Sequence, residues 1–199
     1  MQIDEKSRIF DSFRKHVETI HDINESDWEF LREHFKLCSF KKGELILEPG
    51  KRADVFYYIG SGLVKRYFIS QEGKHFITNF DGENRIISDF ASFILKRSST
   101  IYIQALEDTT LLMSDFDVAE ALRQKSPIWE RIGRLIAESR YIEKCEREYN
   151  LLYYKAKERL EIFEKEFADY KHKISQKDIA SYLGITPESL NRLIKNSKP

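Results

Sequence analysis

The sequence predicts an α+β fold in which an N-terminal β-barrel is followed by a long helix and by a small, all-α C-terminal unit. Residues 37–114 contain short runs of β-branched and aromatic side chains separated by glycines, a pattern typical of an all-β barrel or sandwich. Residues 126–149 carry apolar side chains at helical spacing. Residues 174–194 contain two short capped segments around Gly184, which indicates two helices joined by a tight turn.

Two helices are expected before the barrel. Apolar side chains recur there at the three-to-four spacing of an amphipathic helix: Ile9, Phe10, Phe13, Val17 and Ile20 in the first segment, and Trp28, Leu31 and Phe35 in the second. Ser26 and Glu29 have the spacing of a capping box, so the second helix is expected to begin at Ser26.

The barrel strands are expected between glycine-containing turns. The candidate strands are residues 45–47, 55–59, 63–69, 75–80, 100–106 and 109–114. Residues 86–99 lack strand alternation and end in the polar run Lys96-Arg97-Ser98-Ser99. An irregular segment inside a regular barrel is where a ligand-binding loop is expected.

The long helix is expected to begin with Ser126 as its N-cap and Pro127 at its first position. One seam at heptad spacing consists of Ile128, Ile132, Leu135, Ser139, Ile142, Glu146 and Tyr149, with a second stripe of Trp129, Gly133 and Ile136 beside it. Two apolar faces predict that one packs on the barrel and the other on a second copy of the chain, in a parallel dimer. Burial of the helix within its own domain is the alternative.

The apolar pattern breaks at Asn150, so the sequence predicts one domain at residues 1–149, with the dimer helix at about 126–149, and a second domain at residues 150–199. Residues 171–199 contain six Lys or Arg and two acids, whereas the whole chain has 33 basic and 33 acidic residues. A basic C-terminal unit on a mildly acidic body is a common arrangement in DNA-binding proteins.

Composition also restricts the function classes. Two distant cysteines, Cys38 and Cys145, are too few for a disulfide framework, a zinc site or an iron–sulfur cluster. No apolar run approaches the roughly 18 residues of a membrane span, and the N-terminal segment lacks the apolar stretch of a signal peptide. A cytoplasmic protein with no membrane partner is expected.

Residues 174–194 have the order of a helix-turn-helix. Ser175 is placed to cap the first helix, and Gly184 ends it where a positive φ is usually required. Thr186 caps the second helix and Pro187 takes its first position. The predicted inner face consists of Ile179, Ala180, Leu183, Leu190, Leu193 and Ile194. Because the second helix of this motif enters the major groove, the sequence predicts DNA binding; a helical hairpin used only for packing is the alternative.

The predicted DNA-binding residues are the outward positions of the second helix, namely Thr186, Glu188, Ser189, Asn191, Arg192 and Lys195. Arg192 can bond bidentately to guanine, Asn191 can pair with adenine, and Glu188 can accept from cytosine N4. The hydroxyl of Ser189 and the ammonium of Lys195 suit phosphates.

Together these features resemble the Crp/Fnr family of bacterial regulators. The residues that carry the resemblance are Pro49-Gly50, the run from Tyr58 to Val64 and Gln71-Glu72-Gly73 in the barrel, and the run from Ile179 to Leu190 with Arg192 in the helix-turn-helix. The resemblance implies a cyclic-nucleotide-binding-type barrel (a jelly roll), a long dimerisation helix, and base contacts from Glu188 and Arg192. It also implies a homodimer that binds double-stranded DNA, with RNA polymerase as a further partner.

The positions that hold a cyclic nucleotide in members of that family differ here. The pair that holds the ribose falls on Ser88-Asp89, and the Arg-Ser/Thr pair that holds the phosphate falls on Ser99-Thr100. Ser99 cannot supply the bidentate positive charge that a phosphate favours. The effector-binding candidates are these positions, the neighbouring Arg97 and a dimer-helix position: Ser88, Asp89, Arg97, Ser99, Thr100 and Lys144.

No cofactor is therefore assigned, and the expected effector is unknown or absent, with a cyclic nucleotide as the alternative. A haem would need His75 of the barrel as its ligand, and a solvated strand histidine is the preferred interpretation of that residue. In its usual form the family continues past the recognition helix into a β-hairpin wing, whereas four residues follow Lys195. Lys171 and Lys173 are candidates to replace the phosphate contacts of the wing.

A cyclic-nucleotide-binding signalling module that does not bind DNA is the alternative function. An enzyme is not expected, because the histidines, at positions 16, 21, 34, 75 and 172, are scattered and form no two-histidine metal motif in the barrel. Neither catalytic nor metal-ligating residues are predicted.

Overall fold

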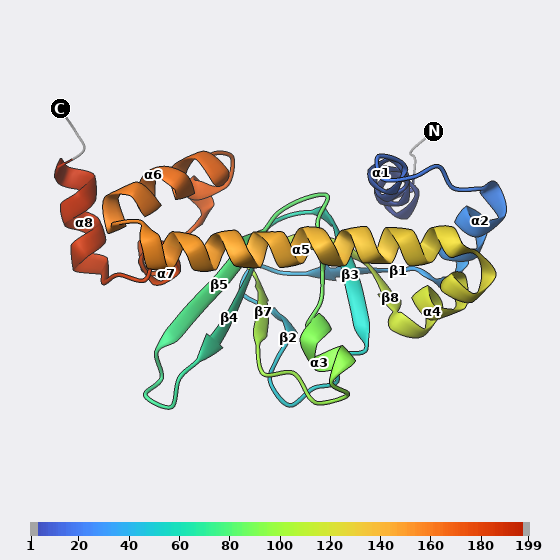
Figure 1. Ribbon diagram of the computed structural model, residues 1–199, viewed down its shortest axis with the longest axis horizontal. Coiled ribbons are helices and arrows are strands. Elements are labelled where there is room, and N and C mark those ends of the chain that lie inside the picture. The colour runs from blue at the N-terminus through green and yellow to red at the C-terminus, as the bar shows by residue number, and fades with distance from the viewer. Residues whose placement is uncertain (1–3, 197–199) are drawn as a thin grey trace.

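Two four-stranded antiparallel sheets form the body of the computed structural model, which describes residues 4–196 (Figure 1). One sheet has the strand order β1-β8-β3-β6 and the other β2-β7-β4-β5. The strands are β1 (Lys36–Phe40), β2 (Leu45–Leu47), β3 (Val55–Ser61), β4 (Val64–Ile69), β5 (His75–Asp81), β6 (Ile86–Ile87), β7 (Tyr102–Ala105) and β8 (Thr109–Asp115). The predicted α+β class with a jelly-roll barrel is confirmed.

Helices cover the two ends of the barrel and run along one side of it (Figure 1). They are α1 (Glu5–Glu18), α2 (Glu25–His34), α3 (Phe90–Ile94), α4 (Phe116–Lys125), α5 (Pro127–Tyr153), α6 (Ala156–Glu166), α7 (Gln176–Tyr182) and α8 (Pro187–Asn196), with a 3-10 turn at Lys171–Lys173. Among these described helices, none combines the length and apolar character needed to cross a bilayer.

The barrel core contains side chains from both sheets, including Ile59, Ile103 and Leu111, which are fully buried. Two strands were not predicted. Strand β1 forms because it pairs with β8, with Cys38 opposite Leu111, and β6 is a two-residue strand held by β3. Both depend on a distant partner strand, which local periodicity cannot reveal.

The N-terminal helices pack their predicted stripes into one aromatic cluster that includes Phe10, Phe13 and Trp28. The expected start of the second helix at Ser26 is wrong. The N-cap is Asn24, whose side-chain oxygen accepts from the Asp27 backbone N–H at 2.9 Å. Ser26 lies inside the first turn of α2 and cannot cap it.

Helix α5 runs lengthwise past the barrel (Figure 1) and begins as predicted, with the Ser126 hydroxyl accepting from the Ile128 N–H. It continues four residues beyond Tyr149, and the chain becomes extended only at Tyr154. The expected break at Asn150 is therefore wrong, because that residue lies inside the last helical turn and its carbonyl accepts from the Tyr154 N–H.

The two halves of α5 have different surroundings. In the first half, Trp129 and Ile132 are buried in the N-terminal cluster, so Ile132 belongs to the face that packs on its own chain and not to the predicted outer seam. In the second half, apolar side chains are exposed on the outer face: Tyr141, Ile142, Tyr149, Leu152 and Tyr153. Helices α6 to α8 follow at that end of α5 (Figure 1).

Candidate DNA interface and sensor loop

Helices α7 and α8 form the predicted helix-turn-helix. The Ser175 hydroxyl accepts from the Asp178 N–H at 3.1 Å and caps α7. Gly184 has φ of 67° and ends α7, a conformation that glycine adopts without steric cost. The Thr186 hydroxyl accepts from the Ser189 N–H at 3.2 Å at the start of α8. The local signals in the sequence are all realised here.

Helix α8 has a buried inner face and an exposed outer face. Leu190 is fully buried, and Leu193 and Ile194 are half-buried. Of the six predicted DNA-binding residues, Ser189 is half-buried and the others are exposed: Thr186, Glu188, Asn191, Arg192 and Lys195. In Figure 1, α8 lies at the extreme end of the molecule, beyond the C-terminal end of α5. The outer face of α8 is therefore open to a large partner.

Two features of this face concern the side chains of Arg192 and Glu188. The guanidinium of Arg192 donates to the Ser189 hydroxyl at 3.3 Å, which leaves most of its five donors free. A hydrogen bond from its own backbone, one from the Thr186 side chain and the nearby Arg192 charge lower the pKa of Glu188. Glu188 is thus ionised at neutral pH and can accept from an exocyclic amine.

The two lysines suggested as replacements for the wing lie in the 3-10 turn before α7. Lys173 forms an ion pair with Glu107 of the barrel at 2.9 Å. Lys171 lies 3.9 Å from Glu164 of α6. Lys173 thus fastens this turn to the barrel, while Lys171, in a looser pair, keeps an exposed ammonium.

The predicted ligand-binding loop, residues 86–99, is here called the sensor loop, and it folds back on itself. Asp89 and Ser99, both nearly completely buried, are brought together as the sequence positions suggested. The Asp89 carboxylate accepts from the Ser99 hydroxyl at 2.9 Å and from the Ser92 N–H at 3.2 Å. Backbone bonds of Ser99 with Gly50 and Lys51, each 2.9 Å, close the loop onto the β2–β3 turn.

The remaining effector candidates are more exposed than this pair. Ser88 is half-buried, while Arg97, Thr100 and Lys144 are exposed. At the Asp89–Ser99 pair the loop presents a carboxyl group and a hydroxyl that are already hydrogen-bonded to each other. Two open hollows lie over α1 and α2; one, of about 310 Å³, is lined by Arg8, Asp11, Ser12 and Lys15.

His75 does not stand out as a metal or haem ligand. Its ring stacks on Tyr67 with 5.0 Å between centroids, and Tyr67 stacks in turn on Tyr102 at 4.9 Å. Within residues 4–196, no group of three or more His, Cys, Asp or Glu side chains is placed to hold a metal ion.

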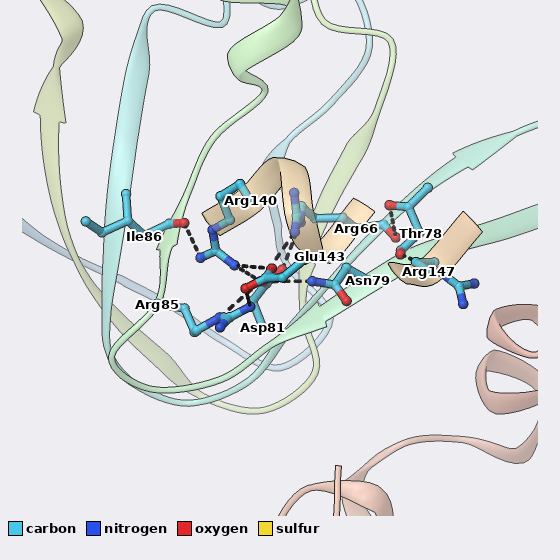
Figure 2. Close-up of polar contacts among 9 residues, drawn as sticks. All are labelled: Arg66, Thr78, Asn79, Asp81, Arg85, Ile86, Arg140, Glu143 and Arg147. Atoms are coloured by element: carbon cyan, nitrogen blue, oxygen red, sulfur yellow. Dashed lines mark hydrogen bonds and ion pairs between the residues drawn. The ribbon is translucent and has the colours of Figure 1, made fainter. Parts of the chain in front are cut away.

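Sequence reasoning missed a buried ionic network between α5 and the barrel, which Figure 2 shows. The side chain of Asp81 is fully buried at the end of β5. It accepts from Arg66 at 2.8 Å, from Asn79 at 3.2 Å and from Arg140 of α5 at 3.4 Å. Such a carboxylate is stable inside a protein only with partners of this kind.

Arg140 extends the network along α5. It donates to the Ile86 carbonyl at 2.6 Å and to Glu143 at 2.9 Å, and Glu143 accepts from Arg85 at 2.7 Å (Figure 2). The signal in the sequence is the spacing of Arg140 and Arg147, which places them on one helix face. This network holds the barrel-facing side of α5 and turns its apolar stripe outward.

Comparison with known proteins gives the same architecture. The family described as "Cyclic nucleotide-binding domain" matches residues 37–126 of the chain. The chain is 29% identical over 170 residues to the Anaerobic regulatory protein of Haemophilus influenzae, covering 77% of this chain and 63% of that protein. It is also 29% identical over 175 residues to Regulatory protein HlyX of Actinobacillus pleuropneumoniae, covering 77% and 68%.

Among solved structures, a transcriptional regulator attributed to the Crp/Fnr family from Eubacterium rectale superposes with a TM-score of 0.74 at 17% identity, covering 92% of this chain and 87% of the other. FixK2 from Bradyrhizobium japonicum gives 0.72 at 19% identity, covering 81% and 83%. In sequence the chain is similar to these bacterial regulatory proteins, and in fold it is similar to a structure attributed to the Crp/Fnr family.

At under 20% identity these two structures show that the chain shares their fold. The chain spans 63% of the length of the first curated relatives it matches. Those relatives carry the names of regulatory proteins.

Cyclic AMP and cyclic GMP are expected not to bind this chain, because Asp89 and Ser99, two of the predicted effector positions, bond to each other. A ligand present at 100 times its Kd stabilises the folded state by about 2.7 kcal/mol, which raises the Tm of a chain of this size by roughly 5–10 °C. Differential scanning fluorimetry with each nucleotide at about 1 mM should show no shift. A rise of several degrees would contradict the closed-loop account.

Proposed function

We propose that the chain is a sequence-specific, homodimeric DNA-binding transcription regulator that binds DNA without a cyclic nucleotide. The observation that carries the proposal is the outer face of α8, where Glu188, Asn191 and Arg192 are exposed together at the end of the molecule. The similarity to regulatory proteins and the closed sensor loop support it. The alternative of a nucleotide-binding signalling module is disfavoured by the Asp89–Ser99 bond.

The dimer would form along the exposed half of α5. Ile142, Cys145, Tyr149 and Leu152 have the 3-4-3 spacing of a coiled-coil seam. Ile142, Tyr149 and Leu152 are 55%, 52% and 81% exposed, values unusual for large apolar side chains that have no partner. Pairing of two copies in parallel would cover this stripe and place both α8 helices at the same end of the dimer.

Cys145, the exposed one of the two cysteines, makes it possible to test the parallel alignment of the two α5 helices. In a parallel dimer, the two Cys145 thiols face each other across the seam, so mild oxidation should link the chains within the short Cβ–Cβ distance of a disulfide. Cys38 should not react, because burial raises the pKa of its thiol to about 11 and the thiolate is the reactive form. A non-reducing gel should show a dimer band that Cys145→Ser removes and Cys38→Ser retains; a band that survives Cys145→Ser contradicts the parallel seam.

Arg192 is expected to read a base. Arg192→Ala should cost about 1–3 kcal/mol on the preferred site and relax the preference at one base pair. Lys195→Ala should instead weaken binding to all sequences alike and reduce the salt dependence by about one counterion. Fluorescence anisotropy over a panel of single-base variants at several salt concentrations separates the two. Unchanged base preference in Arg192→Ala would remove the assignment.

The further partners follow from this role. A regulator bound at a promoter would meet RNA polymerase, which we propose as a partner at activated sites. Its action on the chromosome would place it in the cytoplasm of a bacterial cell. The division into a sensor unit and a DNA-binding unit stays part of the proposal, with the connection at Tyr154, where α5 ends.

A further inference from the structure

The first helix of the helix-turn-helix is attached to the barrel. Strand β5 is the edge strand of its sheet, and α7 lies along it. The Ser181 hydroxyl accepts from the Ile77 N–H at 3.1 Å and donates to the His75 carbonyl at 2.7 Å. One side chain of α7 thus forms hydrogen bonds with two backbone groups on the open edge of β5, as a neighbouring strand would.

A buried ion pair joins the same two parts. The ammonium of Lys65, on β4, lies 3.0 Å from both carboxylate oxygens of Asp178, on α7. Their side chains are only 10% and 12% exposed. Removing two charges from water is costly and is offset only in one geometry. The pair therefore favours one placement of α7 over nearby alternatives.

Two further contacts fix the same placement. Arg147 of α5 donates to the Thr78 carbonyl of β5 at 3.0 Å and to the Tyr182 carbonyl of α7, and its guanidinium lies 3.6 Å from the centre of the Tyr182 ring. Tyr170 packs so closely against Gly82 that a Cβ atom on residue 82 would lie 2.4 Å from the Tyr170 ring. Helix α5, the barrel and α7 are thus joined at one point.

Helix α8 cannot move independently of α7. Ala180, Leu183 and Leu190 are fully buried in one cluster that also contains Leu63 and Phe80 of the barrel. The barrel, α7 and α8 therefore share a core, and whatever fixes α7 also fixes the direction in which α8 projects.

We propose that Lys65 and Asp178 are positioning residues that fix the separation of the two recognition helices in the dimer. This inference rests on the proposed function. The residues touch no DNA; they hold α7, and through it α8, in one orientation on the barrel. The dimer consequently selects operators by the spacing of their half-sites, while Arg192 and its neighbours select by base.

Operator spacing provides the test. Full-length dimers are titrated with duplexes that carry the same two half-sites but differ in centre-to-centre spacing by single base pairs, each step moving one half-site by about 3.4 Å. The wild type is expected to prefer one spacing by at least about tenfold over its neighbours. Lys65→Met, which keeps the aliphatic stem and removes the charge, should reduce that preference to about threefold or less without changing base preference.

Two further variants complete the design. Lys41→Met is the matched control, because Lys41 pairs with Asp108 at the surface and should keep full spacing preference. Ser181→Ala is a milder disruption should Lys65→Met fold poorly, and it should broaden the preference in the same direction. Hydrogen exchange at the Ile77 amide should accelerate in Lys65→Met and not in Lys41→Met, which reports the attachment without DNA.

The outcomes separate this inference from the proposed function. A folded Lys65→Met and a folded Ser181→Ala that both keep the wild-type spacing preference overturn the positioning role and leave DNA binding intact. Wild-type protein that binds no duplex of any spacing overturns the proposed function and the inference with it. Loss of spacing preference with retained base preference supports both.

Discussion

Ile142→Glu combined with Tyr149→Glu is expected to convert the dimer to a monomer and to weaken operator binding by roughly 10²–10⁴-fold. Both side chains are more than half exposed in the single chain, so the substitutions should not disturb its fold. In the proposed dimer they place four carboxylates in an apolar seam, where burying unpaired charge is costly. The second half-site then no longer benefits from the effective concentration that dimerisation supplies.

Light scattering gives the oligomeric state, and anisotropy on the two-half-site duplex gives the affinity. The matched control is Lys36→Glu, an exposed position on β1 that changes the net charge by the same two units. It should remain dimeric and lose little affinity. If the double variant stays dimeric and binds as well as the wild type, the dimer does not use the exposed face of α5.

Asp81→Ala is expected to destabilise the folded chain by about 3–5 kcal/mol. The substitution leaves the guanidinium groups of Arg66 and Arg140 without the carboxylate between them (Figure 2). An unpaired buried charge costs far more than a lost surface contact. Because Arg140 also ties α5 to the Ile86 carbonyl, the loss should weaken the contact between the dimer helix and the barrel.

Asp108→Ala serves as the control, because Asp108 pairs with Lys41 in solvent and such exposed pairs contribute little to stability. Urea unfolding followed by tryptophan fluorescence gives both free energies of unfolding, since Trp28 and Trp129 are buried in the same cluster. If both variants lose a similarly small part of the free energy of unfolding, the folded chain does not depend on the Asp81 network.

The sequence predicted the parts of the fold that depend on short-range signals. The caps at Ser126, Ser175 and Thr186 lie within three residues of the groups they bond, so their chemistry is visible locally. The start of α2 was misplaced because Asn24 and Ser26 are both acceptable caps, and only the folded backbone decides between them.

The contacts that position the candidate site were not predictable from one sequence. Lys65 and Asp178 are 113 residues apart, and Asp81 and Arg140 are 59 apart. A lysine on a strand and an aspartate in a first helical turn each have an ordinary explanation at the surface. Only the packing of α7 and α5 against the barrel gives them partners.

The sensor loop illustrates the same limit on a smaller scale. Asp89 and Ser99 were selected as effector candidates by position, and the loop does bring them together. Their direct hydrogen bond depends on the path of residues 90–98 between them, including α3. The composition of the loop indicated a ligand-binding site. In the folded chain, the hydrogen bond between Asp89 and Ser99 closes that site.

Selection of binding sites from a random duplex library tests the central claim most directly. Purified wild-type protein is mixed with the library at about 0.15 M salt without nucleotide, and Arg192→Ala is run in parallel. The account predicts a palindromic motif with half-sites about one helical turn, roughly 34 Å, apart, and a weakened base preference at one position of each half-site for Arg192→Ala. No enriched motif, with or without cyclic nucleotides, would contradict DNA reading by α8.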